Sequence, residues 1–266
     1  MIPLDQQVKL GDFMLRVRRV NSTRNRTGSE SPVLVFLHDS LGCVETWRDF
    51  PQRLAERVGL DSLIYDRRGY GQSSPFGREA RTTEYLHEEA GVLFMLLEAL
   101  AIERVVLFGH SDGGSIALIA AAQRPGHVDG VITEGAHVFV EDVTLSGIRK
   151  AKAMLASTDL RERLARYHGS KADAVAAAWI DTWLSPEFRD WNIESSLPPI
   201  VCPVLAIQGD DDEYGTPAQV QAIVDGVGAR ARSLMLPRVG HTPHRDATNA
   251  VLDESVEFMA SNNLDS

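Results

Sequence analysis

Short apolar runs recur along the chain and predict a series of buried β-strands. Each run is four or five residues long and rich in Val, Ile and Leu, which is typical of strands covered on both faces. They lie at residues 33–37, 62–65, 105–108, 130–133 and 204–207, and a last strand is predicted at 233–236. Residues 13–20 are more polar and predict a strand at the edge of the sheet.

Helical patterns separate these runs. Leu86, Ala90, Leu93, Leu97 and Leu100 recur at helical spacing and predict the buried face of a long helix. Strands that alternate with helices indicate a mostly parallel, twisted sheet with helices on both faces. The sequence therefore predicts the α/β fold class.

From about residue 139 to residue 196 the alternation of strands and helices stops. This segment predicts three or four short helices rich in Ala, Leu and Trp. Trp179 and Trp183 are four residues apart on one helical face, which Val175 completes. Such a stripe is typical of core packing, so packing and ligand contact both remain open for these tryptophans.

The motif Gly109-His110-Ser111-Asp112-Gly113 lies between a predicted strand and a helix rich in small residues. A G-x-S-x-G sequence in this setting is typical of a sharp turn that exposes the serine hydroxyl at the carboxyl end of a sheet. Ser111 is therefore a candidate nucleophile.

A serine nucleophile needs a base and an acid, and both occur later in the chain in the expected order. The run at 204–207 is followed by Gly209 and three aspartates, and the run at 233–236 is followed by His241. We expect His241 to take the proton of Ser111 and an aspartate to orient His241.

With these residues in place, the chain resembles the α/β-hydrolase superfamily over residues 33–135 and 203–259. Residues 37–42 are similar to the oxyanion loop of the family, with Asp39 where a glycine is usual, and residues 65–73 resemble its D-x-R-G-x-G-x-S turn with one extra residue. The resemblance implies a core formed by residues 1–138 and 197–266, with a helical lid at residues 139–196.

The resemblance also assigns roles. The family's G-x-x-D spacing falls on Asp212 as the acid, and the backbone N–H groups of Ser40 and Asp112 are the expected oxyanion hole. A lid that covers the carboxyl end of the sheet makes four residues candidate substrate contacts: His137, Phe139, Trp179 and Trp183.

Three alternatives remain open for these roles. Asp210 and Asp211 also follow Gly209, and Glu134 ends the strand before the lid, where some members of the superfamily carry the acid. His241 and His244 form an H-x-x-H pair that can bind a metal, but no third ligand has suitable spacing, so we expect no metal.

Four further polar residues flank the predicted nucleophile and oxyanion loop. His38 and His110 are expected to orient these loops through hydrogen bonds. Asp39 and Asp112 place carboxylates where negative charge develops during acyl transfer, which is unfavourable unless they point away or pair with a cation. They leave open a preference for substrates that carry a positive charge or hydrogen-bond donors.

The composition limits the partners. A net charge of −10 argues against nucleic acid or an anionic membrane surface, because either attracts a basic face. The sequence has no run of 18 apolar residues and no signal-peptide pattern, and its two cysteines suit a reducing compartment. We therefore expect a cytoplasmic protein with a small-molecule substrate, and we leave a homodimer open. The P-loop and dinucleotide fingerprints are absent, so we expect no organic cofactor.

We predict a serine hydrolase that cleaves a carboxylic ester, lactone or thioester of a small, partly apolar substrate through an acyl-enzyme on Ser111. The alternatives are a carbon-carbon bond hydrolase of the same fold, or a ligand receptor with vestigial hydrolysis. Turnover separates them, because a receptor stalls near one equivalent of product.

Overall fold

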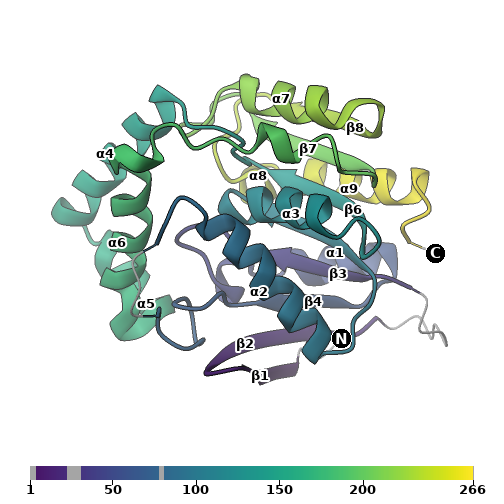
Figure 1. Cartoon of the computed structure of the whole chain (residues 1–266), viewed down its shortest axis with the longest axis horizontal. Helices are drawn as coiled ribbons and strands as arrows, with labels where there is room; N and C mark the ends of the chain where they lie inside the picture. Colours follow the sequence, from purple (N-terminus) through teal and green to yellow (C-terminus); the bar gives the residue numbers. More distant parts are fainter. Residues whose placement is uncertain (1–3, 23–30, 78–80, 266) are drawn as a thin grey trace.

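The computed structural model describes residues 4–22, 31–77 and 81–265, and the strands within them form a single sheet (Figure 1). In spatial order the strands run β1-β2-β4-β3-β5-β6-β7-β8. The pairs β1/β2 and β2/β4 are antiparallel, and all other neighbours are parallel. Their bounds are β1 Leu4–Leu10, β2 Phe13–Val20, β3 Val33–Leu37, β4 Ser62–Tyr65, β5 Val105–His110, β6 Val128–Glu134, β7 Val204–Gly209 and β8 Ala231–Leu236.

Helices cover both faces of this sheet, as expected for the α/β class. The α-helices are α1 Phe50–Val58, α2 Tyr85–Ala99, α3 Asp112–Gln123, α4 Asp142–Ser157, α5 Leu160–His168, α6 Ala172–Trp183, α7 Pro217–Val227, α8 Pro243–Asp246 and α9 Thr248–Ser261. Short 3-10 helices occur at Val44–Trp47, Gly169–Lys171, Pro186–Phe188, Glu194–Ser196 and Gly228–Arg230. Helices α2, α3 and α7 contribute to one hydrophobic cluster, and α1 and α9 contribute to the other.

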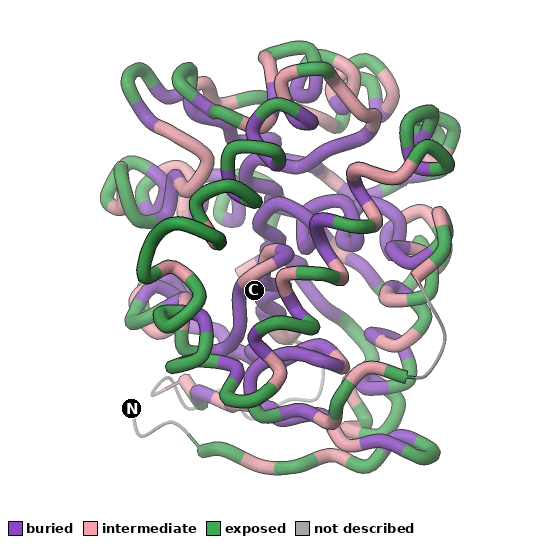
Figure 2. Tube along the Cα trace, turned by 90° about the vertical axis from the view of Figure 1, so that its left-hand side faces the viewer, coloured by how far each residue is buried: buried purple, intermediate pink, exposed green. Residues whose placement is uncertain are grey.

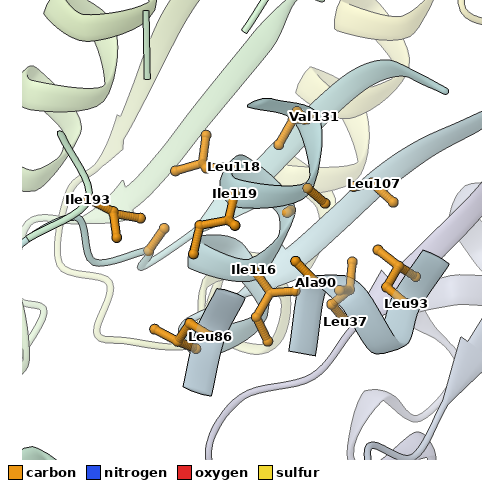
Figure 3. Packing of buried hydrophobic residues seen from close by; sticks show 14 of the residues in the cluster. Leu37, Leu86, Ala90, Leu93, Leu107, Ile116, Leu118, Ile119, Val131 and Ile193 are labelled. Atoms are coloured by element: carbon orange, nitrogen blue, oxygen red, sulfur yellow. The ribbon is translucent and has the colours of Figure 1, made fainter. Parts of the chain in front are cut away.

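The predicted apolar face of α2 lies in the first of these clusters. Leu86, Ala90 and Leu93 are fully buried and lie beside Ile116 of α3 (Figure 3). Helix α3 is itself buried along almost its whole length, because its small side chains allow it to lie close to the sheet. This packing fixes the helix that begins directly after Ser111.

The prediction that residues 13–20 form the edge strand is wrong. The strand at this edge of the sheet is β1, which the sequence pattern missed because four of its seven residues are polar or charged, and β8 forms the other edge. Strand β2 looked polar because of its arginines, yet Arg16 is only 3% exposed. Its guanidinium pairs with Asp5 of β1 and with Glu45, so an ion-pair network and not solvent surrounds this charge.

The parallel strands end together at one edge of the sheet, and this alignment positions the site. Leu37 pairs with Gly109, His110 pairs with Glu134, and Gly209 pairs with Leu236. The residues that follow β3, β5, β6, β7 and β8 are therefore neighbours in space although they are far apart in sequence.

Helices α4, α5 and α6 lie together at one end of the sheet (Figure 1). Figure 2 views the molecule from the side of these helices and shows exposed turns of the chain in front of the buried interior. Val175, Trp183 and Phe188 are buried, and Trp183 and Phe188 belong to the same hydrophobic cluster as the core residues of α2 and α3. The division of the chain into a core and a lid at residues 139 and 196 remains a prediction.

Candidate active site

Ser111 occupies a strained turn between β5 and α3. Its backbone has φ 55° and ψ −120°, a region that side-chain-bearing residues rarely adopt. A Cβ at Gly109 would lie 2.2 Å from the carbonyl oxygen of Gly113, and a Cβ at Gly113 would lie 2.0 Å from that of Leu37. Glycine is therefore the residue that fits at both positions, as the G-x-S-x-G motif predicts.

The structure brings Ser111, His241 and Asp212 together. His241 Nε2 lies 3.0 Å from Ser111 Oγ, and His241 Nδ1 lies 2.9 and 3.0 Å from the two carboxylate oxygens of Asp212. The Asp212 carboxylate also accepts hydrogen bonds from the backbone N–H of Tyr214 and from Gln208 Nε2. Burial alone would raise the pKa of Asp212, but the hydrogen bond and charge of His241 outweigh it and lower this pKa.

The geometry separates Asp212 from the other candidate acids. Asp210 and Asp211 are exposed, whereas the Asp212 side chain is buried against His241. Glu134 is not hydrogen-bonded to His241. Its carboxylate instead accepts a 2.7 Å hydrogen bond from His244 Nδ1. His244 is thus paired with a carboxylate, which accounts for the second histidine of the H-x-x-H sequence.

The two predicted oxyanion donors lie on either side of the nucleophile. Ser40 and Asp112 both line the cavity that contains Ser111. No acceptor is found for the backbone N–H of either residue within the described parts of the chain. Two free donors beside a serine hydroxyl can stabilise a developing oxyanion.

Both carboxylates near these donors lie beside basic side chains. Asp112 Oδ2 lies 3.4 Å from Nη2 of Arg67, which is fully buried. Asp39 Oδ2 lies 3.3 Å from His110 Nδ1. Negative charge beside the site is therefore offset by a guanidinium on one side and an imidazole on the other.

His38 and His110 both form hydrogen bonds with the loops beside Ser111, as the sequence analysis expects. His38 Nδ1 donates to the carbonyl of Asp39, and its Nε2 accepts from the backbone N–H of Arg67. Burial lowers the pKa of His38, which agrees with a neutral ring that accepts at one nitrogen. His110 Nε2 lies 2.7 Å from the carbonyl oxygen of His241.

A cavity of about 210 Å³ opens above Ser111. Three of the four candidate substrate contacts, His137, Trp179 and Trp183, line it. The fourth, Phe139, is not among the lining residues, and its backbone forms a β-bridge with Asn192. The remaining lining residues include several that the sequence did not single out: Leu41, Thr144, Ile148, Tyr214, Thr242 and Arg245.

Of these additional lining residues, Tyr214 is the one that its position in the sequence could have identified. It lies two positions after Asp212, and its ring centroid is 4.8 Å from that of His241. Its carbonyl oxygen accepts from His137 Nε2 and from Thr144 Oγ1. Proximity to the predicted acid could have suggested Tyr214, whereas Thr144 and Ile148 of α4 carry no such signal.

Within the part of the chain that the structure describes, none of the helices is both long enough and apolar enough to cross a membrane.

Comparisons with known proteins agree with this architecture. Residues 32–189 match the family model of the α/β hydrolase fold. The chain is 32% identical to human serine hydrolase BPHL over 195 residues, which are 70% of this chain and 65% of that protein, just under two thirds of its length. It is 25% identical to mouse sn-1-specific diacylglycerol lipase ABHD11, with 86% of this chain and 81% of that protein covered.

Solved structures show the same fold. The structure of a 2-hydroxy-6-oxo-6-phenylhexa-2,4-dienoate hydrolase from Rhodococcus superposes with a TM-score of 0.82 at 14% identity, covering 97% of this chain and 99% of that one. The enol-lactonase of Burkholderia xenovorans superposes with a TM-score of 0.75 at 20% identity, covering 96% of this chain and all of that one.

Proposed function

The chain belongs to the α/β-hydrolase family, and from this premise we propose that it is a serine hydrolase that uses Ser111, His241 and Asp212 as its catalytic triad. The observation that carries the proposal is the 3.0 Å contact between Ser111 Oγ and His241 Nε2 at the floor of a cavity. The human and mouse relatives are themselves named as a serine hydrolase and a lipase, which supports this assignment.

The reaction follows from the positions of the groups. Ser111 Oγ attacks the carbonyl carbon of the substrate while its proton passes to His241 Nε2. The tetrahedral intermediate places its oxyanion between the N–H groups of Ser40 and Asp112. When the tetrahedral intermediate collapses, His241 donates its proton to the leaving group, which departs. An acyl group remains on Ser111.

Water then completes the cycle. His241 takes a proton from a water molecule, the resulting hydroxide attacks the acyl carbonyl, and the proton returns to Ser111 Oγ as the acid is released. Asp212 holds the Nδ1–H tautomer of His241 and offsets the positive charge that the ring carries between these steps.

We propose a small, partly apolar ester, lactone or thioester as the substrate. A cavity of about 210 Å³ suits a short acyl group, and Ile148, Trp179 and Trp183 supply apolar surface. The relatives' names differ in substrate, so the bond that is cleaved is a question for experiment.

The polar side of the cavity supports a further preference. Asp112 Oδ1 and His137 Nδ1 are buried acceptors without a hydrogen-bond partner among the described residues, and both residues line the cavity. Burial lowers the pKa of His137, which keeps its ring neutral and its Nδ1 able to accept. We therefore propose that a substrate group with hydrogen-bond donors or a positive charge is favoured beside Ser111.

The test is hydrolysis of p-nitrophenyl acetate, butyrate and octanoate by the wild type and by Ser111→Ala, with Ser233→Ala on the exposed edge strand as the matched control. We expect turnover by the wild type and the control, and a loss of about 10⁴-fold or more in Ser111→Ala. A burst that stalls near one equivalent indicates a receptor. Absence of any reaction favours a carbon-carbon bond hydrolase.

A further inference from the structure

His110 connects two loops that approach Ser111 from opposite sides. Its Nδ1 lies 3.3 Å from Asp39 Oδ2 in the oxyanion loop, and its Nε2 lies 2.7 Å from the carbonyl oxygen of His241. The side chain is 4% exposed and packs against the rings of Trp47 and His244. The ring is thus held in one position directly before the nucleophile.

We propose that His110 is a positioning residue: a positively charged bridge that fixes the oxyanion loop and the His241 loop relative to Ser111 and offsets the Asp39 carboxylate. The proposal rests on the serine hydrolase function argued above and adds a residue that acts through Ser40 and His241.

The oxyanion side of the bridge acts through Asp39. This residue directly precedes Ser40, whose N–H is an oxyanion donor, and its second carboxylate oxygen accepts from the backbone N–H of Leu41 at 2.7 Å. The Asp39 side chain therefore links the oxyanion loop to His110. Loss of the His110 contact frees the donor to move, and small displacements of catalytic groups are costly.

The other side of the bridge acts on the base. His110 Nε2 can contact the His241 carbonyl only as a donor, since a carbonyl oxygen only accepts. Nδ1 likewise must donate to an ionised Asp39. With Asp39 ionised, both ring nitrogens of His110 therefore face acceptors, at 3.3 Å and 2.7 Å, and only the imidazolium form donates from both.

The surrounding charges favour that form. Asp39 and Glu134 face His110 with carboxylates, and the rings of His241 and His244 lie at 5.1 and 5.2 Å. Burial opposes the charge, but the hydrogen bond and charge of Asp39 outweigh it and raise the pKa of His110 to about 9. The same contact lowers the pKa of Asp39 despite its burial.

The charge of His110 also offsets the charge of the Asp39 carboxylate. An isolated carboxylate at Asp39 would repel the oxyanion that forms at Ser40, because like charges in a partly buried site interact strongly. The His110 cation removes this repulsion. Removal of His110 alone should therefore harm catalysis more than removal of both members of the pair.

The experiment compares His110→Asn, His110→Gln, Asp39→Asn and the double variant Asp39→Asn/His110→Asn on p-nitrophenyl butyrate, with folding checked by circular dichroism and thermal unfolding. Asn can keep a neutral donor near Asp39 and Gln one near His241, so both single variants retain a link but lose the charge. We expect kcat to fall about 10- to 100-fold in both, with KM changed little. The double variant should recover at least part of the loss seen in His110→Asn.

The pH profile supplies a second readout. In the wild type kcat should fall as pH rises through about 9, because the imidazolium exists below that pH and loses a proton above it. Asp39→Asn should move this decline to lower pH, and His110→Gln should lack it. The signal of the His110 ring in an NMR titration, assigned by its absence in His110→Gln, should change over the same range.

Three results overturn the bridge: kcat unchanged in both folded His110 variants, a double variant no better than His110→Asn, or a His110 ring that titrates below pH 7. If the His110 variants do not fold, the pH profile of Asp39→Asn decides, because its decline in kcat should still lie at lower pH than that of the wild type. Failure of the serine hydrolase function is distinguishable, because it appears as absence of turnover in the wild type and leaves the His110 titration unaffected.

Discussion

The two sides of the cavity are built in different ways. On the sheet side, Ser111, His241 and Asp212 are joined by hydrogen bonds of 2.9 to 3.0 Å, so each reactive atom has a defined partner. The other side is formed by the helical segment, residues 139–196. Its residues Ile148, Trp179 and Trp183 line the cavity and offer the substrate mostly apolar contact. We infer from this difference that hydrogen-bond geometry sets the chemistry on the sheet side, whereas the helical side selects the acyl group of the substrate by shape.

The helical side is nevertheless anchored to the core. The indole N–H of Trp183 donates to the hydroxyl of Tyr85 at 2.9 Å, and the ring centroids of Tyr85 and Phe188 are 5.8 Å apart. His168 of α5 accepts from the backbone N–H of Gly71 and contacts the carbonyl of Leu41. The apolar wall of the cavity therefore has a fixed position over Ser111.

The largest effect is expected on the sheet side. Asp212→Asn should lower kcat by about 10⁴-fold, because an amide cannot hold the Nδ1–H tautomer and the charge of His241 as a carboxylate does. Steady-state hydrolysis of p-nitrophenyl butyrate measures this loss.

Glu134→Gln is the matched control for that variant. It removes a buried carboxylate that contacts His244 and not His241, so we expect a lower free energy of unfolding, by about 1 to 3 kcal/mol, with most of the turnover kept. Loss of activity in Glu134→Gln together with retention in Asp212→Asn would show that the acid has been misassigned.

An intermediate effect is expected on the helical side. Trp179→Ala enlarges the cavity, so the ratio of kcat/KM for octanoate to that for butyrate should rise by about 30-fold while acylation of Ser111 persists. Trp191→Ala is the control, since Trp191 is buried in the same aromatic packing but does not line the cavity. Equal changes in both variants would contradict a shape-based choice of substrate.

The smallest effect concerns Asp112, where the two sides meet. A glycyl and a propionyl p-nitrophenyl ester differ by an ammonium in place of a methyl group. Asp112→Asn should reduce the preference for the glycyl ester by about tenfold, because the carboxylate no longer attracts the charge while the backbone N–H remains. An unchanged preference removes the proposed selectivity for donors and cations.

The sequence predicts the sheet side well, for physical reasons. The buried strands have continuous apolar runs, and the strained turn at Ser111 requires glycines that are visible in the motif. The order of nucleophile, acid and base follows from the ends of successive strands. The resemblance to the family's G-x-x-D pattern favoured Asp212, and the contact with His241 then separated it from Glu134.

Other features depend on contacts that no local pattern contains. Arg16 contributed to the polar pattern of residues 13–20, and its burial could not be predicted because its partners Asp5 and Glu45 lie on other segments of the chain. The pairing of His110 with Asp39 joins residues 71 positions apart and required the strand register. Phe139 and Thr144 lie close in sequence, yet only Thr144 lines the cavity, because side-chain direction in the helical segment depends on packing.

Trapping the acyl-enzyme tests directly whether Ser111 is the nucleophile of a serine hydrolase. Wild-type protein is mixed with p-nitrophenyl butyrate, quenched in acid at short times, and analysed by intact mass and peptide mapping, with Ser111→Ala in parallel. If Ser111 is the nucleophile, one butyryl group forms on Ser111 and decays at rates consistent with turnover, and the variant carries no adduct. Turnover without an adduct on Ser111, or an equal adduct in Ser111→Ala, would contradict it.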